Sequence, residues 1–159
     1  MGRRLKVGVI SDTHGRFDES VTPIFKGVDL IIHAGDVGKA DVIHRLEQIA
    51  PVLAVEGNND APGRFPAERI ENLAGRTVLI RHIFGEPHQM GKKERAIIDE
   101  LAPDIVIFGH SHRPYQGVVG DTILFNPGSA GPKRFSLPRT VGLMLIGNSS
   151  IDINICPLE

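Results

Sequence analysis

The stretch LKVGVISDTH at residues 5–14 decides the fold. Its first six residues are mostly apolar, rich in valine, and end at Ser11-Asp12, which predicts a strand buried on both faces. Asp12 and His14 follow directly on either side of Thr13, so in an extended turn their side chains point the same way. The stretch therefore predicts a strand that ends in one carboxylate and one imidazole.

Three further apolar runs end in polar residues of the same kinds. Residues 30–34 precede Gly35-Asp36, residues 53–56 precede Gly57-Asn58-Asn59-Asp60, and residues 104–108 precede Gly109-His110-Ser111-His112. Oxygen and imidazole ligands of these types suit hard or borderline divalent ions. Two such ions roughly 3.5–4 Å apart can hold both the attacking and the leaving oxygen of a phosphoryl transfer. The layout therefore predicts a two-metal site at strand ends.

The whole chain divides into an alternating part and a hairpin part. Strands are predicted at residues 5–10, 28–33, 52–55, 76–82 and 105–108, and helices at 17–26, at 41–50 with Asp41 as the N-cap, and at 92–101 with Ala96, Ile97 and Leu101 on one face. Hairpins follow at residues 115–125 and 140–155. Both parts are satisfied by an α/β fold: a four-layer α/β/β/α sandwich of two mixed β-sheets flanked by helices.

Length and composition fit one globular domain over residues 1–159, with 41% hydrophobic and 23% charged residues. The net charge of -1 argues against a broad surface for nucleic acid. A lone cysteine, Cys156, excludes an intrachain disulfide and fits a cytoplasmic location. The apolar run at 5–10 is too short for a signal-peptide core, and nothing approaches the roughly 20 apolar residues of a membrane span.

Each motif alone also has an ordinary structural explanation. Asp12 and His14 could be plain turn residues, Asp36 could be a helix cap, and a Gly-Asn-Asn-Asp turn needs no function. Asn126-Pro127-Gly128-Ser129 is as consistent with a plain turn as with support of the site. His33, inside an apolar run, is interpreted as a core or supporting histidine, and His44 as a solvated one. The pair His110 and His112 directly after a buried strand is the most specific single motif.

In combination, the motif order resembles that of the calcineurin-like metallophosphoesterases. The order is Asp-x-His, Gly-Asp, Gly-Asn-x-Asp, a strand-end histidine, Gly-His-x-His and Asn-Pro-Gly-Ser, and it covers about the whole chain. The chain is most similar to the small single-domain phosphodiesterases of that superfamily, and the retromer small subunit has a related fold. The resemblance implies that Asp12, His14 and His112 bind a first metal and that Asp36 bridges it to a second.

The same resemblance implies that Asn58, His110 and a histidine from the middle strand hold the second metal. His82, which closes the run at residues 77–81, best matches that histidine, and His88 in the next loop is its rival. The family usually has glycine directly after this histidine, whereas Ile83 stands here.

A second departure concerns catalysis. Many phosphatases of the superfamily have histidine where Asn59 stands, and the small phosphodiesterases often lack it. Asn59 can donate a hydrogen bond to a phosphate oxygen but cannot act as a general acid near neutral pH. Asp60 is expected to orient the site without the usual imidazole partner, while His110, His112 and Asn59 stabilise charge on the phosphoryl group.

We therefore expect a binuclear metal-dependent phosphoesterase that favours diesters and works by attack of a metal-bridging hydroxide. Manganese fits the oxygen-rich ligands well, and nickel, iron, zinc and magnesium stay open by ligand type. The expected partner is a small phosphate ester, with no membrane and no nucleic acid beyond a small nucleotide; a homo-oligomer stays open. The alternatives are a scaffold on the same fold and a nuclease, which the near-neutral charge and the lack of an added DNA-binding domain disfavour.

Overall fold

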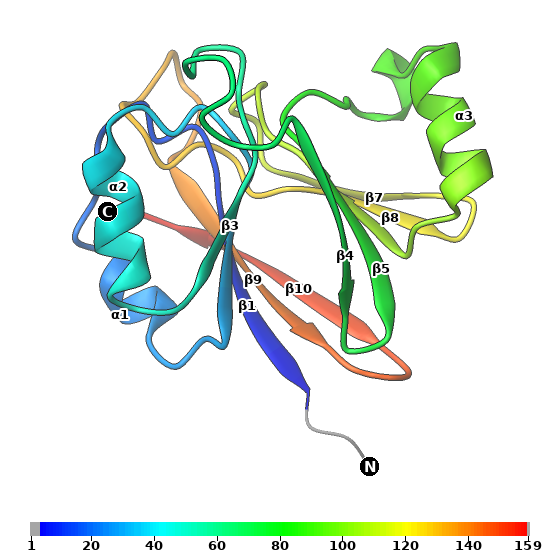
Figure 1. Ribbon diagram of the computed structural model, residues 1–159, viewed down its shortest axis with the longest axis horizontal. Coiled ribbons are helices and arrows are strands. Elements are labelled where there is room, and N and C mark those ends of the chain that lie inside the picture. Colours follow the sequence, from blue (N-terminus) through cyan, green and yellow to red (C-terminus); the bar gives the residue numbers. More distant parts are fainter. Residues whose placement is uncertain (1–3, 159) are drawn as a thin grey trace.

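The computed structural model describes residues 4–158, which form two β-sheets packed face to face (Figure 1). One sheet has the strand order β10-β9-β1-β2-β3 and the other β4-β5-β6-β8-β7. The strands are β1 (Leu5–Ile10), β2 (Leu30–His33), β3 (Val52–Ala54), β4 (Glu68–Leu73), β5 (Arg76–Arg81), β6 (Ile105–Ile107), β7 (Tyr115–Val119), β8 (Thr122–Asn126), β9 (Thr140–Ile146) and β10 (Ile151–Pro157). Both sheets are five-stranded and mixed, as the sequence predicted.

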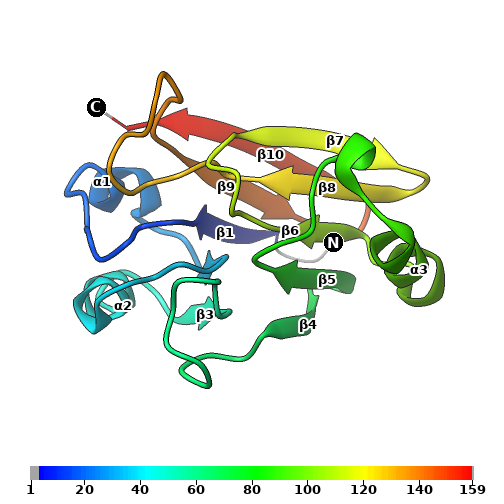
Figure 2. The ribbon, with the colours of Figure 1, turned by 90° about the horizontal axis from the view of Figure 1, so that it is seen from above.

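Parallel strands form the centre of each sheet. In the first sheet β1 pairs with β2 and β2 with β3 in parallel, and β9 and β10 add an antiparallel hairpin. In the second sheet β5, β6 and β8 are parallel, and β4 and β7 pair antiparallel at the two edges. Figure 2 shows β1 and β5 pointing the same way, so their carboxyl ends lie at one end of the molecule.

Helices cover the outer faces of the sheets. The helices α1 (Val21–Phe25) and α2 (Ala40–Glu47) lie on the outer side of the first sheet, and α3 (Lys92–Leu101) lies beside the second (Figure 1). Phe25 and Leu46 pack with Ile10 and Ile31 of the first sheet, while Ile98 packs with Leu79 of the second. These layers confirm the predicted four-layer α/β/β/α sandwich.

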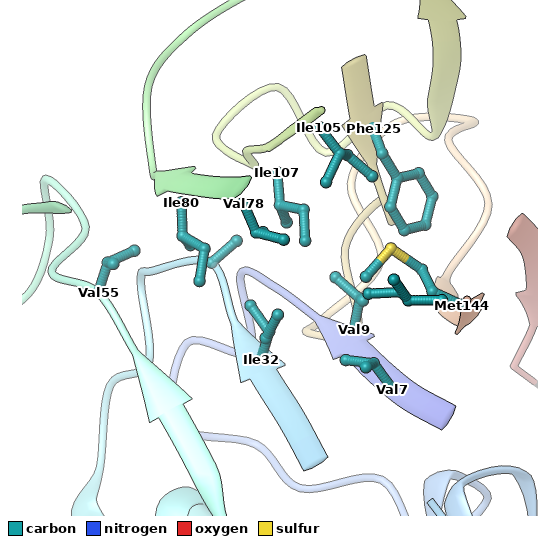
Figure 3. Packing of buried hydrophobic residues seen from close by; sticks show 12 residues of the cluster. Val7, Val9, Ile32, Val55, Val78, Ile80, Ile105, Ile107, Phe125 and Met144 are labelled. Atoms are coloured by element: carbon teal, nitrogen blue, oxygen red, sulfur yellow. The ribbon is translucent and has the colours of Figure 1, made fainter. Parts of the chain in front are cut away.

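The main core lies between the two sheets (Figure 3). Its buried side chains include Val7, Val9, Ile32, Val78, Ile80, Ile105, Ile107 and Met144. Since side chains alternate along a strand, the residues between them face the helices instead. Gly8 shows this alternation, because a Cβ on it would lie 2.9 Å from the ring of Phe25. The central residues of β1, β5 and β6 are therefore buried on both faces, which explains the apolar runs at 7–10, 78–80 and 105–107.

Three local predictions were wrong. The edge strand β4 was not predicted, because Glu68–Leu73 is largely polar and alternates exposed and half-buried residues. Asp41 is not the N-cap of α2: the helix begins at Ala40, Lys39 occupies the cap position, and no side chain caps it. In α3 the buried residue is Ile98 rather than the exposed Ala96. Pro23 lies in the first turn of α1, where a missing N–H costs little.

Residues 87–89 of the predicted loop at 84–91 form a short 3₁₀ helix, η1 (Pro87–Gln89). Within residues 4–158, no helix is both long and apolar enough to cross a membrane.

Candidate metal centre

The predicted site residues come together at the carboxyl ends of parallel strands from both sheets. Asp12 and His14 follow β1, Asp36 follows β2, Asn58 follows β3, His82 follows β5, and His110 and His112 follow β6. Backbone hydrogen bonds fix these loops to one another: Asp12 N–H donates to Gly35 O at 3.0 Å, and Gly109 N–H donates to His82 O at 2.9 Å. The centre therefore lies where the two sheets meet.

Asp12 is the buried carboxylate at the middle of this centre. Its Oδ2 accepts hydrogen bonds from Ser11 Oγ at 2.6 Å and from the His110 backbone N–H at 3.1 Å. Its Oδ1 is buried and has no hydrogen-bond partner among the described residues. Burial alone would raise the pKa of Asp12, but the neighbouring His112 and His82 imidazoles and the Ser11 hydroxyl outweigh burial and lower it. Asp12 therefore stays ionised, with one oxygen available to a cation.

A first cluster that could hold an ion consists of Asp12, His14 and His112. The Nε2 atoms of the two histidines lie only 3.3 Å apart, and the Nε2 atoms of His14 and His112 lie 3.9 Å and 3.4 Å from Asp12 Oδ1. These ligand atoms all lie within 4.8 Å of one another. Two imidazole nitrogens and one carboxylate oxygen thus face a common point, which is the arrangement a divalent ion requires.

A second cluster that could hold an ion consists of Asp12, Asp36 and His82. His82 Nδ1 donates to Ala34 O at 2.7 Å, and this bond directs Nε2 toward Asp36 Oδ2 at 3.3 Å and Asp12 Oδ1 at 3.7 Å. A backbone carbonyl on the far nitrogen is the usual way a protein orients a metal-binding imidazole. A Cβ on Gly35 would lie 2.6 Å from His82 Nδ1, so glycine is required for this approach.

The electrostatics of this second cluster favour cations. Burial lowers the pKa of His82, but the neighbouring Asp36 and Asp12 carboxylates and the Ala34 carbonyl outweigh burial and raise it. Burial raises the pKa of Asp36, but hydrogen bonds involving His82 and Asn59 lower it well below its usual range. Two ionised carboxylates thus concentrate negative charge in a buried place.

Asn58 and His110 lie at the exposed rim of the centre, outside the two clusters. Asn58 Oδ1 is 3.1 Å from His110 Nδ1, and the His110 ring meets the His82 ring edge-on with centroids 5.4 Å apart. Asn59, also exposed, donates its backbone N–H and its side-chain amide to the two oxygens of Asp36, both at 2.9 Å. These three residues therefore border the space that opens from the clusters toward solvent.

Asp60 has a different environment from the one expected of an orienting catalytic residue. Its buried carboxylate accepts backbone N–H groups from Gly57 at 2.9 Å, Gly38 at 3.1 Å and Val37 at 3.2 Å. Both oxygens are thus used to tie the loop after β2 to the loop after β3. Asp60 therefore positions backbone groups of these two loops, and its expected role in orienting the site stays a prediction.

Backbone strain concentrates at the centre. Among residues 4–158, eight residues other than glycine have positive φ, and five are predicted site residues: Asp12, His14, Asp36, His110 and His112. This conformation costs an L-residue roughly 1–2 kcal/mol, somewhat less for aspartate. Clusters of such residues are typical of functional sites, where the surrounding structure compensates for the strain. The sequence signals no such strain, because it depends on loop contacts.

The other histidines lie away from these clusters. His88 is exposed in η1, and His44 is exposed on α2. His33 is fully buried, and its Nε2 lies 2.9 Å from Thr13 Oγ1. Burial lowers the pKa of His33 to about 4, so it is a neutral core histidine as interpreted from the sequence.

Three residues support the centre, and only Ser11 was missed by reasoning from the sequence, since the turn at residues 126–129 was named as a possible support. Ser11 holds Asp12, and Asn126 Nδ2 donates to Gly109 O at 3.0 Å. Ser129 Oγ donates to Asp12 O at 3.1 Å. The Asn-Pro-Gly-Ser turn was a sufficient signal for the last two, because it follows β8 at the same end of the sheet.

The donor set fits divalent metal ions. A buried carboxylate oxygen and a buried imidazole nitrogen, Asp12 Oδ1 and His82 Nε2, both lack a hydrogen-bond partner in the described part of the chain. Such orphaned atoms are costly unless something fills the space between them. A cation held by carboxylate and imidazole ligands removes the cost and suits metals such as manganese, zinc or iron.

Comparison with known proteins agrees with this geometry. Residues 5–149 match the calcineurin-like phosphoesterase superfamily domain, and the chain belongs to this superfamily. It is 34% identical over 148 residues to a probable metallophosphoesterase of Methanothermobacter thermautotrophicus, covering 89% of this chain and 86% of that protein. It is 27% identical over 155 residues to a phosphodiesterase of Methanocaldococcus jannaschii, covering 88% of this chain and 92% of that protein.

The fold is shared with Vps29 of Chaetomium thermophilum, at a TM-score of 0.83 and 17% identity over 98% of this chain and 86% of that one. The chain is thus a metal-dependent phosphoesterase by family.

Proposed function

We propose that this protein binds two divalent metal ions and hydrolyses small phosphodiesters. The first ion is held by Asp12, His14 and His112, and the second by Asp36, His82, Asn58 and His110. Asp36 Oδ2 lies 3.8 Å from His14 Nε2 and 3.3 Å from His82 Nε2, and in this proposal Asp36 would bridge the two ions. Manganese is the metal we expect first, because carboxylate and amide oxygens make up much of the ligand set.

One observation carries the proposal. Asp12 Oδ1 is buried, ionised and unpartnered among residues 4–158, and three imidazole nitrogens face it at 3.4–3.9 Å. A histidine that only packs in a core forms a hydrogen bond, as His33 does with Thr13. The convergence of three imidazoles on a carboxylate is best explained by cations between them.

The chemistry divides between the ions and the chain. When bound, two ions lower the pKa of a water molecule and neutralise phosphate oxygens. Asn59 and His110 are exposed at the rim: the Asn59 amide donates one N–H to Asp36 Oδ2, and we infer that its second N–H and the His110 imidazole position the substrate. Such preorganised donors stabilise charge as it develops on the phosphoryl group. Asn59 supplies no proton, so the leaving group has to be a stable anion.

Diesters are favoured over monoesters because of position 59. Both ester types release an alkoxide and would gain from an acid beside the leaving oxygen, so the preference for diesters rests on the resemblance to the small phosphodiesterases, which often lack a histidine at position 59. The relationship to a phosphodiesterase of Methanocaldococcus jannaschii supports the same preference. The likeness to Vps29, at 17% identity, concerns the fold alone and does not favour the scaffold alternative.

A metal-by-substrate matrix tests the proposal. Chelator-stripped protein is reloaded with manganese, nickel, iron, zinc or magnesium and assayed on a diester, a monoester, a cyclic nucleotide and pyrophosphate. We expect no turnover without metal and the fastest turnover of the diester with manganese. If no metal restores turnover of any of these substrates, the proposed function is wrong.

A matched pair of variants tests the bridging role. Asp36→Asn removes one negative charge between the clusters and is expected to lower turnover at least 100-fold and to reduce the metal content. Asp41→Asn changes an exposed carboxylate in the first turn of α2 and is expected to leave both unchanged. Near-normal turnover of Asp36→Asn with both metals bound would remove Asp36 from the bridging position.

A further inference from the structure

A cavity of about 290 Å³ lies directly beside the candidate metal centre. Its walls include Ile83, Phe84 and Phe108 on the apolar side and Gln89, Glu94 and His110 on the polar side. The loop after β5 and the start of α3 border it on one side, and the turn after β6 on the other. A cavity of about 150 Å³ already accepts a benzene ring. This one has room for a ring with substituents.

His110 connects the cavity to the metal centre. Its imidazole lines the cavity, while its Nδ1 lies 3.1 Å from Asn58 Oδ1 and its ring meets that of His82. His110 thus lies between the metal-binding clusters and the cavity. If a phosphoryl group is bound at the clusters, one of its ester oxygens would point past His110. The alcohol attached to that oxygen would then lie in the cavity.

The floor of the cavity is apolar. Phe84 and Phe108 are nearly fully buried, with ring centroids 6.4 Å apart, and both line the cavity. Ile83 also lines it and has 52% of its surface exposed, although it directly follows the buried His82. A large apolar side chain exposed at the rim of a polar centre is not required by the core, since the main core cluster forms without it. It is instead placed to cover an apolar ligand.

The polar side of the cavity disfavours additional phosphates. Glu94 and Gln89 border it, and no lysine or arginine occurs among the lining residues. Glu94 Oε1 accepts the Gly91 N–H at 3.0 Å, and Gln89 Oε1 accepts the Glu86 N–H at 3.1 Å, so both side chains are held in place. The oxygens of Glu94 and Gln89 disfavour a second phosphate and can accept a hydrogen bond from a neutral group.

We propose that this cavity binds the alcohol part of the substrate, which makes the preferred substrates phosphodiesters with one neutral, apolar or aromatic alcohol. The proposal rests on the proposed function, because the alcohol enters this cavity only when its phosphoryl group is held beside His110. Ile83 is the residue that sets this specificity: its side chain lines the cavity next to His110 and reaches solvent.

Two phosphonates that the enzyme cannot hydrolyse test the proposal. Phenylphosphonate and methylphosphonate carry the same charged group and differ in the part that would enter the cavity. Binding of each to manganese-loaded protein is measured by calorimetry, and the isoleucine methyl signals are followed by NMR in zinc-loaded protein, because paramagnetic Mn²⁺ broadens the signals beside the centre. We expect phenylphosphonate to bind about tenfold more tightly and to shift the Ile83 methyl signal, whereas methylphosphonate leaves that signal in place.

A matched pair of variants assigns the effect to the cavity. Ile83→Ala is expected to weaken phenylphosphonate binding about fivefold and to leave methylphosphonate binding unchanged. Ile70→Ala is the control, because Ile70 is an isoleucine of nearly equal exposure, 53%, on the edge strand β4. Ile83→Asp places a second carboxylate at the cavity and is expected to abolish the preference for the phenyl group. Thermal unfolding of each variant checks that the fold is intact.

The outcomes separate this inference from the function on which it rests. Equal affinity for the two phosphonates, or an equal loss in Ile70→Ala and Ile83→Ala, would overturn the cavity proposal and leave the phosphoryl site standing. Binding of neither phosphonate to the manganese-loaded protein would overturn both.

Discussion

At the scale of single residues, the centre is defined by atoms that lack partners. Asp12 places one oxygen against Ser11 and the His110 backbone and leaves the other facing three imidazoles. Asp36 differs from Asp12, because both of its oxygens accept hydrogen bonds from Asn59. Its Oδ2 also lies 3.3 Å from His82 Nε2. Asp12 and Asp36 are both buried and charged, and burying a charge without a cation beside it has a high free-energy cost. Residue identity alone predicts carboxylates and imidazoles, and their burial makes a metal centre the best explanation.

The two candidate histidines of the middle segment can be separated by metal content. His82→Ala removes a buried nitrogen that faces two carboxylates, whereas His88→Ala removes an exposed side chain of η1. We expect His82→Ala to lose at least one ion per chain and His88→Ala to keep the wild-type content. Elemental analysis after extensive dialysis measures it. Loss of a metal in His88→Ala alone would show that the strand-end alignment is wrong.

Asn59 predicts how rate depends on the leaving group. Without an acid at this position, the departing oxygen leaves as an anion, and rates fall steeply as the pKa of the alcohol rises. General acid catalysis is typically worth roughly 100- to 10,000-fold, so alkyl diesters should be slower than activated aryl diesters by at least that range. A series of substituted phenyl diesters gives the slope. A shallow slope would mean that another group, such as His14 or His112, donates the proton.

At the scale of elements, strand ends deliver the functional groups. Strands β1, β2 and β6 are largely apolar and buried toward their carboxyl ends, and the polar ligands then follow in turns with positive φ or glycine. This arrangement explains why the sequence predicted the strands at 5–10 and 105–107 and the residues after them. It also explains why β4 was missed: this edge strand carries no ligand, and its polar alternation lacks the buried signature.

Glycine is needed where two such turns touch. A Cβ on Gly57 would lie 2.1 Å from both the backbone nitrogen and the Oδ1 atom of Asp36, and backbone cannot yield at that distance. We expect Gly57→Ala to displace Asp36, with a loss of about 2–4 kcal/mol in stability and most of the activity. Gly147→Ala is the control, because its nearest neighbours are atoms of the flexible Arg4 side chain, at 3.3 Å and beyond.

Chemical unfolding and turnover of the two variants measure this prediction. Wild-type stability and activity in Gly57→Ala would mean that the turn after β3 can move away from Asp36. The close approach would then have no part in building the centre.

At the scale of the whole molecule, both sheets are needed for the centre. The first sheet supplies Asp12, His14, Asp36 and Asn58, and the second supplies His82, His110 and His112. The apolar runs in the sequence predicted two sheets, and the motifs that follow these runs predicted the order of the ligands along the chain. It could not predict which backbone groups Asp60 would bind or that His110 would wall a cavity, because both depend on distances between loops far apart in sequence.

A long-range ion pair behind the centre predicts acid sensitivity. Arg139 Nη1 lies 2.8 Å from Asp18 Oδ2, and Arg139 also donates to the carbonyls of Ala130 and Gly131. Burial raises the pKa of Asp18, but hydrogen bonds from Ser20 and Arg139 outweigh burial and hold the pKa at about 2, below its ordinary 3.8. Because the folded pKa is lower, this carboxylate stabilises the fold above about pH 4 and the contribution is lost as pH falls to 2.

Asp18→Asn should therefore be less stable than wild type at pH 6 by up to about 2 kcal/mol, and the gap should close by pH 2. Urea unfolding of the two metal-free proteins over this range measures the gap. Asp121→Asn, at an exposed turn, serves as the control and should differ from wild type by less than about 0.5 kcal/mol. A gap between Asp18→Asn and wild type that stays constant with pH would contradict the role of the ion pair.

The central claim is that two ions lie between Asp12, Asp36 and the imidazoles that face them. Anomalous X-ray diffraction from crystals of the manganese-loaded protein tests it most directly. We expect two anomalous peaks roughly 3.5–4 Å apart, one beside Asp12, His14 and His112 and one beside Asp36 and His82. A single peak, or peaks that lie away from Asp12 and Asp36, would contradict the two-metal centre.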